Sequence, residues 1–243
     1  MTLNKNKTPY SKNIVGKGFI ATNLGKIKNL IKKNKYIIYA AGISNSKIKS
    51  KKELEKELNL FKVFSKQNIS KKIIYISTAD VTHNLTNKSK YVQNKIIIEK
   101  QIKKKFKHYI IIRLPQIIGK SKNKKTLINY FYFKIKYNEK LSIMKEYKRN
   151  ILDIDDVLKD LKIILLNKKI KNKIITLSNK YFIKPIDIVK TFEKKLSKKA
   201  NYSFKNSPKQ NWNLNYKTNS IYFKKANVKF HNNYLAKKIN KYY

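Results

Sequence analysis

Three observations predict an α/β fold in which helices cover both faces of a parallel sheet. Strand-like and helix-like segments alternate along most of the chain, which is the pattern of consecutive β-α-β units. A turn with two glycines, Gly16-Lys17-Gly18, stands between a short apolar strand and an apolar helix. A length of 243 residues, 41% of them hydrophobic, can bury a sizeable core. We therefore expect one domain, or one domain with a small second lobe.

The expected elements follow one another in a regular order. We expect strands at residues 12–15, 36–41, 72–77, 108–114 and 173–178. We expect helices at residues 19–34, 50–66, 88–105, 123–138, 155–167 and 185–198. Glu/Lys pairing along the second helix supports it. Residues 1–120 are then a nucleotide-binding region, and residues 121–243 hold the remaining α/β elements with a small lobe, both within one compact unit.

The glycine turn has the form of a dinucleotide-binding loop. Gly16 allows a tight turn, and Gly18 lets backbone amides approach a pyrophosphate closely. Ala21 satisfies the small third position of such a loop. The alternative is an ordinary strand-to-helix turn. The candidate cofactor-binding residues of this loop are Gly16, Lys17, Gly18, Phe19 and Ile20.

A second motif can transfer protons. Tyr91 and Lys95 are four residues apart, so a helix presents both side chains on one face. An ammonium beside a phenol lowers the pKa of the phenol from about 10, which lets tyrosine act as a general acid or base. The motif arises easily by chance in a chain with 17 tyrosines, but it follows a strand that ends in Ser77-Thr78. Thr78, or alternatively Ser77, is expected to hold the reacting oxygen.

Further segments keep a fixed order along the chain: Tyr36-Ile37-Ile38-Tyr39-Ala40-Ala41-Gly42, Asn59, Ile74-Tyr75-Ile76-Ser77-Thr78, Arg113-Leu114-Pro115-Gln116-Ile117-Ile118-Gly119, and Arg149-Asn150-Ile151-Leu152-Asp153-Ile154-Asp155-Asp156-Val157. Together with the two motifs above, this ordered set resembles a shortened member of the extended short-chain dehydrogenase/reductase superfamily, on its NAD-dependent epimerase/dehydratase branch. The resemblance spans roughly residues 12–198 and implies a Rossmann-like sheet with a small C-terminal substrate lobe.

The resemblance also implies roles for individual residues. Ala41 and Gly42 end the strand beneath the cofactor, and Asn59 matches an asparagine of the following helix. Gln116 and Arg149 belong to segments that contact substrate, with Arg149 on the pyrophosphate of a nucleotide sugar. The structural alternative for Arg149 is a salt bridge to Asp153 or Asp155. For Arg113, a hydrogen bond to the turn after its strand is expected.

In the implied mechanism, Tyr91 removes a proton from a sugar hydroxyl as hydride passes to the nicotinamide. Lys95 lowers the pKa of Tyr91 and binds the nicotinamide ribose, while Thr78 orients the substrate oxygen. The reaction is an epimerisation or a reduction of a nucleotide-linked sugar, in surface polysaccharide synthesis. Ala79 stands where 4,6-dehydratases carry an aspartate, which argues against dehydration.

The cofactor end departs from this family. An acidic residue normally follows the glycine loop by about 20 residues to bind the adenosine ribose, but the first acid of this chain is Glu53. Fourteen residues separate Ala21 from Tyr36, so the second and third strands of the family are expected to be missing. Either the glycine-loop helix has then moved to the other face, or its connection breaks the handedness rule. NAD and NADP both stay open, and Lys35 could favour a 2′-phosphate.

The net charge of +46 is discounted as evidence for nucleic acid. Of 59 lysines and arginines only Arg113 and Arg149 are arginine, whereas nucleic-acid sites rely on arginine for bidentate contacts. Frequent lysine, isoleucine, asparagine and tyrosine instead indicate A/T-rich codons.

Without cysteine, thiolate chemistry is excluded, and the isolated histidines indicate no metal site. No signal peptide or membrane span is visible, so a cytoplasmic protein, in which a homodimer is conceivable, is expected.

Two other classes of function stay open. The chain could be a binding or regulatory protein on a catalytically decayed dehydrogenase scaffold, for which the missing strands are the best evidence. It could instead bind nucleic acid through the tail, where Trp212, Tyr216 and Tyr222 stand among lysines. The acids Asp153, Asp155 and Asp156 are expected to begin a helix rather than to bind a metal.

Overall fold

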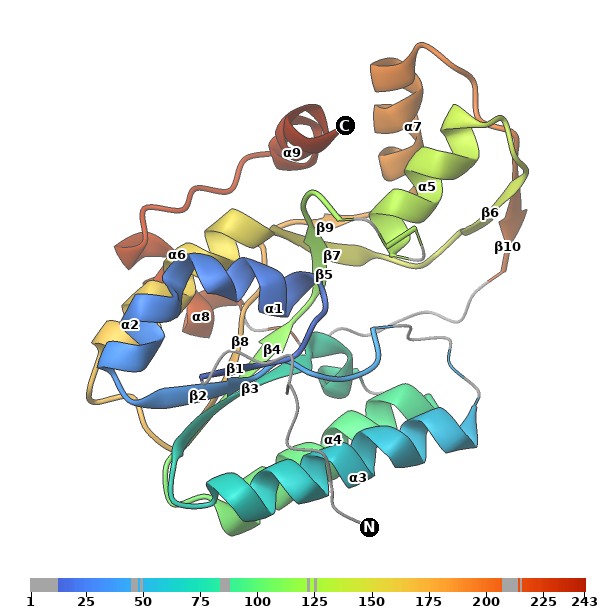
Figure 1. The fold of residues 1–243 in the computed structure, drawn as a ribbon. Coiled ribbons are helices and arrows are strands. Elements are labelled where there is room, and N and C mark those ends of the chain that lie inside the picture. Colours follow the sequence, from blue (N-terminus) through green and yellow to red (C-terminus); the bar gives the residue numbers. More distant parts are fainter. Residues whose placement is uncertain are drawn as a thin grey trace.

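The computed structural model describes residues 13–44, 48, 50–83, 88–121, 123–124, 126–206, 214 and 216–243, with the side chains of 217–220 left aside. Its centre is a five-stranded sheet in the order β1-β2-β3-β4-β8, and every pairing in it is parallel. The strands are β1 (Ile14–Val15), β2 (Tyr36–Tyr39), β3 (Lys72–Thr78), β4 (Tyr109–Leu114) and β8 (Lys173–Thr176). The predicted α/β parallel-sheet fold is confirmed (Figure 1).

Helices cover both faces of this sheet. One face carries α1 (Phe19–Leu24), α2 (Lys28–Lys33), α6 (Ile154–Leu166) and α8 (Tyr216–Lys225), and the other carries α3 (Lys51–Asn68) and α4 (Lys90–Lys105) (Figure 1). Neighbouring strand residues point to opposite faces, so each strand supplies both cores and reads as a continuous apolar run. In β2, for example, Ile38 joins the α1 side and Ile37 the α3 side.

The segment expected as one helix over residues 19–34 is broken in the middle. A 3₁₀ turn at Gly25–Ile27 separates α1 from α2. Ala21, Leu24, Ile27 and Ile31 are nevertheless all buried against the sheet and α6. The break therefore changes the helix axis without changing the face that it covers.

The connection from β1 to β2 has the opposite hand to the two connections that follow it. The chain moves across the sheet in one direction, from β1 to β2, β3 and β4. Its first crossover passes over the face that carries α6, whereas α3 and α4 pass over the other face (Figure 1). Because about 98% of such crossovers are right-handed, we assign that hand to α3 and α4 and the rare left hand to the first. Of the two alternatives that the sequence left open, this arrangement favours a first connection that breaks the handedness rule.

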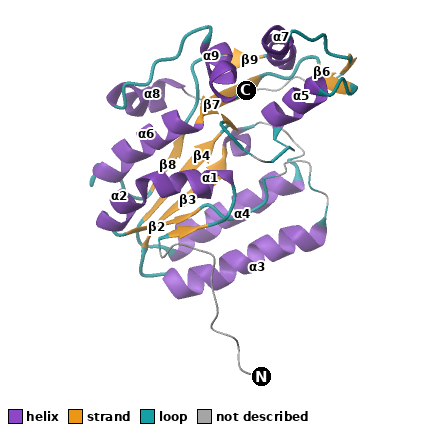
Figure 2. Cartoon of the chain, turned by 45° about the horizontal axis from the view of Figure 1, so that its top comes forward, coloured by secondary structure: helices purple, strands orange, loops and turns teal. Residues whose placement is uncertain are grey.

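The remaining elements gather at one side of this sheet (Figure 2). β5 (Gln116–Ile118) and β9 (Phe182–Ile183) flank β7 (Arg149–Asp153), and β6 (Leu141–Met144) pairs with β10 (Tyr202–Lys205). The helices α5 (Leu127–Lys136), α7 (Pro185–Leu196) and α9 (Tyr234–Tyr242) pack around a separate apolar core. Among the described helices, none is long and apolar enough to cross a membrane.

Candidate active site

Thr78 and Tyr91 meet where β3 ends and α4 begins. Thr78 is the last residue of β3, and the hydroxyl of Ser89 caps α4 by accepting a hydrogen bond from the Val92 amide. This cap starts the helix so that Tyr91 lies in its first turn, where its side chain shares a hydrogen bond with Thr78. Ser77 points elsewhere, because its hydroxyl donates to Glu99 at 2.6 Å. Of the two candidate hydroxyls, the structure brings Thr78 to the tyrosine.

Lys95 lies beside Tyr91, but its charge is shared with an acid. Its Nζ atom is 5.4 Å from the centroid of the Tyr91 ring and 2.7 Å from Oε1 of Glu57. Asn94 donates to the other oxygen of Glu57 at 3.2 Å. Glu57 projects from α3 and is only 3% exposed. The cation that the sequence analysis assigned to Tyr91 and a ribose is therefore bound to a buried carboxylate.

The expected low pKa of Tyr91 is wrong for this structure. Burial raises the pKa of the Tyr91 hydroxyl well above its usual range, and the nearby carboxylates of Asp80 and Glu57 raise it further. The hydrogen bond with Thr78 opposes this shift without overcoming it. Tyr91 is therefore a protonated group at neutral pH, a form that can donate a proton.

Glu57, rather than Asn59, faces the site from α3. Asn59, which matches an asparagine of the family, is exposed on α3. Leu54 and Phe61 are buried on α3, and Glu57 lies between them at helical spacing on the same face. Following this apolar stripe along the sequence would have placed Glu57 inside the protein.

A cavity of about 540 Å³ lies between the glycine loop and α3. A Cβ atom at Gly16 would lie 2.6 Å from the carbonyl oxygen of Ala40, so only glycine allows the loop to approach β2 this closely. At Gly18 an added Cβ would meet open space. The cavity is lined by Gly16, Lys17, Gly18, Tyr39, Ala40, Ala41, Gly42, Ile43, Ser44, Ile48, Glu53, Lys56, Glu57 and Leu60.

The structure thus gathers five of the candidate cofactor residues around one cavity and places two others away from it. Phe19 packs against Gly119, where an added Cβ would lie 2.6 Å from its ring. Ile20 packs against the core beneath α1. Lys95 adjoins the cavity through Glu57, which links the glycine loop to Tyr91.

Arg149 is the first residue of β7. Its guanidinium carbon is 3.8 Å from the centroid of the Tyr147 ring, and it faces Asp80, which follows β3. Burial raises the pKa of Asp80, and the charge of Arg149 partly offsets this. The structural alternative for Arg149 is wrong, because the salt bridges of Asp153 and Asp155 in the described chain go to lysines.

Gln116 is half-buried on β5, where it pairs with Ile151 of β7, two residues beyond Arg149. The two expected substrate contacts therefore lie on adjacent strands.

The expectation for Arg113 is wrong. Its side chain binds both oxygens of Glu99, at 3.0 Å and 2.5 Å, instead of the turn that follows β4.

The acids at the start of α6 serve the fold. Asp153 caps the helix by accepting from the Asp155 amide at 3.1 Å, as the expected helix start requires. Lys238 of α9 binds Asp153 at 2.6 Å and Asp156 at 2.8 Å. In the described part of the chain, no group of three or more histidines or acids is arranged to hold a metal ion.

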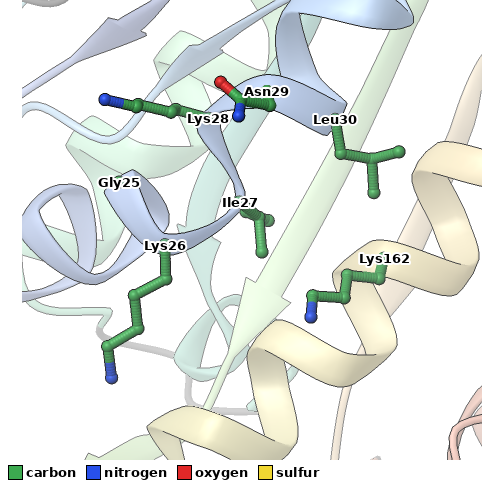
Figure 3. A pocket seen from close by; sticks show the side chains of 7 residues that line it. All are labelled: Gly25, Lys26, Ile27, Lys28, Asn29, Leu30 and Lys162. Atoms are coloured by element: carbon green, nitrogen blue, oxygen red, sulfur yellow. The ribbon is translucent and has the colours of Figure 1, made fainter.

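A smaller hollow of about 260 Å³ lies where α1 meets α2, far along the helix from the glycine loop. Figure 3 shows that Lys26, Lys28 and Lys162 extend in different directions around it instead of converging on one point. Lys26 is also bound to Asp155 at 3.1 Å. We therefore assign no ligand to this hollow.

No protein-family model matches the sequence, and no curated protein matches it. Solved structures do match. UDP-glucuronic acid 4-epimerase from Bacillus cereus, in complex with UDP-glucuronic acid and NAD, is 18% identical with a TM-score of 0.72, over 93% of this chain and 87% of that one. The chain therefore shares the fold of this epimerase, a Rossmann-like parallel sheet with helices on both faces.

Two further structures agree on the fold. RMD from Pseudomonas aeruginosa, complexed with NADPH, is 12% identical with a TM-score of 0.71, over 94% of this chain and 96% of that one. UDP-glucose 4-epimerase from Thermotoga maritima, with UDP-glucose, is 16% identical with a TM-score of 0.60, over 72% of this chain. The match spans 65% of that epimerase, just under two thirds of its length.

Proposed function

We propose that the protein is an NAD(P)-dependent epimerase or reductase that acts on a nucleotide-linked sugar. One observation carries the proposal: Glu57 in the wall of the cavity beside the glycine loop binds Lys95, and Lys95 Nζ lies 5.4 Å from the ring of Tyr91, the hydrogen-bond partner of Thr78. Its volume is in the range of small-molecule sites, about 300–1,000 Å³. It also lies at the carboxyl ends of parallel strands, where ligands of open α/β sheets bind.

The residues present fit a dinucleotide. The backbone of Gly16 and Gly18 would hold its pyrophosphate, Ala41 and Gly42 would lie beneath it, and Lys95 would donate to its nicotinamide ribose. When bound, NAD(P) accepts hydride from, or returns hydride to, the sugar carbon. No acid stands about 20 residues after the glycine loop, so the choice between NAD and NADP stays open in this proposal.

Tyr91 and Thr78 would handle the sugar oxygen. Thr78 would hold this oxygen while Tyr91 exchanges a proton with it. Tyr91 is protonated at neutral pH, so it can donate its proton to a carbonyl oxygen in the direction of a reduction. The matched structures that contain UDP-sugars support a nucleotide sugar as the substrate class.

Residues 121–243 would form the substrate lobe, with Arg149 and Gln116 contacting the substrate beside the catalytic pair. Arginine suits such contact because its donors can bind two anionic oxygens at once. We include in the proposal a role in surface polysaccharide synthesis, a cytoplasmic location and a homodimer.

A decayed scaffold that binds ligands without turnover is the second candidate. The specific observation in its favour is the buried ion pair of Lys95 and Glu57. In this pair, the ammonium that the reaction needs is already bound to a carboxylate. The short edge strand β1 also leaves the adenosine side without the second and third strands of the family.

Nucleic-acid binding through the tail has less support. Trp212 lies outside the described residues, while Tyr216 and Tyr222 pack against the hydrophobic core. Aromatic side chains that pack inward cannot stack on bases.

A calorimetric titration with NADH and with NADPH, each at low and high salt, tests the main proposal. We expect saturable binding of one cofactor that survives high salt, because a specific site does not depend on the net charge of +46. Binding that disappears with salt would contradict it.

Tyr91→Phe then separates the enzyme from the scaffold. Under the main proposal, this variant binds the cofactor as before but loses turnover of a UDP-sugar by a factor of about 10²–10⁴. A parent protein that binds the cofactor but shows no Tyr91-dependent turnover would favour the decayed scaffold.

A further inference from the structure

We infer that Glu57 is a positioning residue of this site, which holds the Lys95 ammonium and controls how much of its charge reaches the Tyr91 hydroxyl. This inference deepens the proposed function and rests on it for its catalytic meaning. The glycine loop and the tyrosine motif do not contain Glu57, which reaches the site from α3.

Both carboxylate oxygens of Glu57 accept hydrogen bonds from neighbouring side chains. One oxygen accepts from Lys95 at 2.7 Å, and the other accepts from Asn94, which is anchored in turn by donating to the carbonyl of Leu54 at 3.0 Å. A Cβ atom at Gly42 would lie 2.3 Å from Oε1 of Glu57 and 2.7 Å from Nζ of Lys95. Any side chain at Gly42 would therefore displace the ion pair.

The distances show that the Lys95 ammonium is paired with Glu57 and not with Tyr91. Lys95 Nζ is 2.7 Å from the carboxylate oxygen but 5.4 Å from the centre of the Tyr91 ring. Electrostatic interaction falls with separation, so at equal dielectric Lys95 interacts more strongly with the Glu57 carboxylate than with the Tyr91 ring. The carboxylate also opposes phenolate formation through its own negative charge.

Other titratable groups also surround Tyr91 and influence its pKa. Asp80 faces it from the 3₁₀ turn after β3, and Arg149 faces Asp80 from β7. Tyr75 of β3 lies on the far side, with its ring 5.9 Å from Lys95 Nζ. In this shell, the hydrogen bond with Thr78 and the Lys95 ammonium both favour a Tyr91 phenolate, and Glu57 is the direct partner of Lys95.

Glu57→Gln tests the inference, with Glu53→Gln as the matched control. Glu53 lies one turn earlier on α3 and lines the same cavity but is exposed. The readout is the alkaline titration of Tyr91, measured as the ultraviolet absorbance difference between each protein and its Tyr91→Phe counterpart. Glu57→Gln removes the competing charge, so the pKa of Tyr91 should fall by at least about one unit, a tenfold gain in tyrosinate at a given pH.

The control should leave the Tyr91 titration unchanged. An unchanged titration in Glu57→Gln, or an equal fall in Glu53→Gln, would overturn the inference. If Glu57→Gln does not fold, Lys95→Gln provides the second arm: it leaves the Glu57 charge beside the phenol and should raise the pKa of Tyr91. No change in Lys95→Gln would overturn the inference as well.

The titration requires neither cofactor nor substrate, so it can succeed where the NADH and NADPH titrations fail, and the two proposals can be rejected separately. Where turnover is measurable, the pH profile of kcat/KM should shift in Glu57→Gln in the same direction as the pKa of Tyr91. A uniform loss of activity at every pH, with no shift, would indicate a purely structural role and would overturn the inference.

Discussion

Two glutamates lie buried on the same face of the sheet, each 3% exposed and each paired with a basic side chain. Glu99 of α4 accepts two hydrogen bonds from Arg113 and one from Ser77. Glu57 of α3 accepts one from Lys95 and one from Asn94, and it borders the cavity.

The difference separates a structural pair from one that can take part in chemistry. The planar guanidinium of Arg113 matches both oxygens of Glu99, and this geometry ties α4 to β4 in a single arrangement. Lys95 makes a single contact with Glu57, and its other donors can turn toward a ligand. An ion pair thus fixes the position of α4 against β4 at Glu99, whereas the ion pair at Glu57 leaves donors of Lys95 able to bind a ligand.

The largest expected effect comes from breaking the locked pair. Arg113→Ala leaves the Glu99 charge buried without its partner, which should lower the free energy of unfolding by about 3–5 kcal/mol. Lys95→Ala should cost less, about 1–3 kcal/mol, because it removes one hydrogen bond from Glu57, whereas Arg113→Ala removes two from Glu99. Urea denaturation of both variants measures the two losses, and equal losses would remove the distinction between the regions.

A third buried carboxylate sharpens the comparison because it has no basic partner of this kind. Both oxygens of Asp160 on α6 are without a hydrogen bond from the described residues. Burial, together with the nearby Asp156, raises the pKa of Asp160 to about 8. The folded protein therefore holds this proton more tightly than the unfolded chain does.

Stability should consequently fall as the pH rises from about 4, the usual pKa of aspartate, through 8. The slope from this one group is at most about 1.4 kcal/mol per pH unit. Asp160→Asn should remove that slope in denaturation measured across this range. The exposed Glu146→Gln serves as control and should keep it. A slope that survives in Asp160→Asn would show that Asp160 ionises freely.

The smallest effect is expected at the C-terminal helix. Lys241 of α9 binds Asp153 and Asp155, but its side chain is 44% exposed. Solvent screens such a pair, so Lys241→Ala should cost no more than about 1 kcal/mol. Thermal unfolding of this variant at low and high salt would show it, and a loss as large as that of Arg113→Ala would mean that exposure does not distinguish these ion pairs.

Much of the sheet was predictable because its signals are local. Apolar strands alternate with helices whose buried residues recur every three or four positions, and these patterns need no knowledge of distant contacts. The strands β5, β6, β7, β9 and β10 lie outside the main sheet, and the sequence did not predict them because they are short and do not stand in the strand–helix alternation that marks β1, β2 and β8.

Local patterns in the sequence predicted the order of the strands and helices along the main sheet, the glycine loop before the first helix, and the one-turn spacing of Tyr91 and Lys95. The hand of the first crossover, the choice of Thr78 over Ser77, and the pairing of Lys95 with Glu57 came from the folded structure. These features depend on contacts between residues far apart in the sequence. Lys95 and Glu57 are 38 positions apart, and only the packing of α3 against α4 brings the acid to the base.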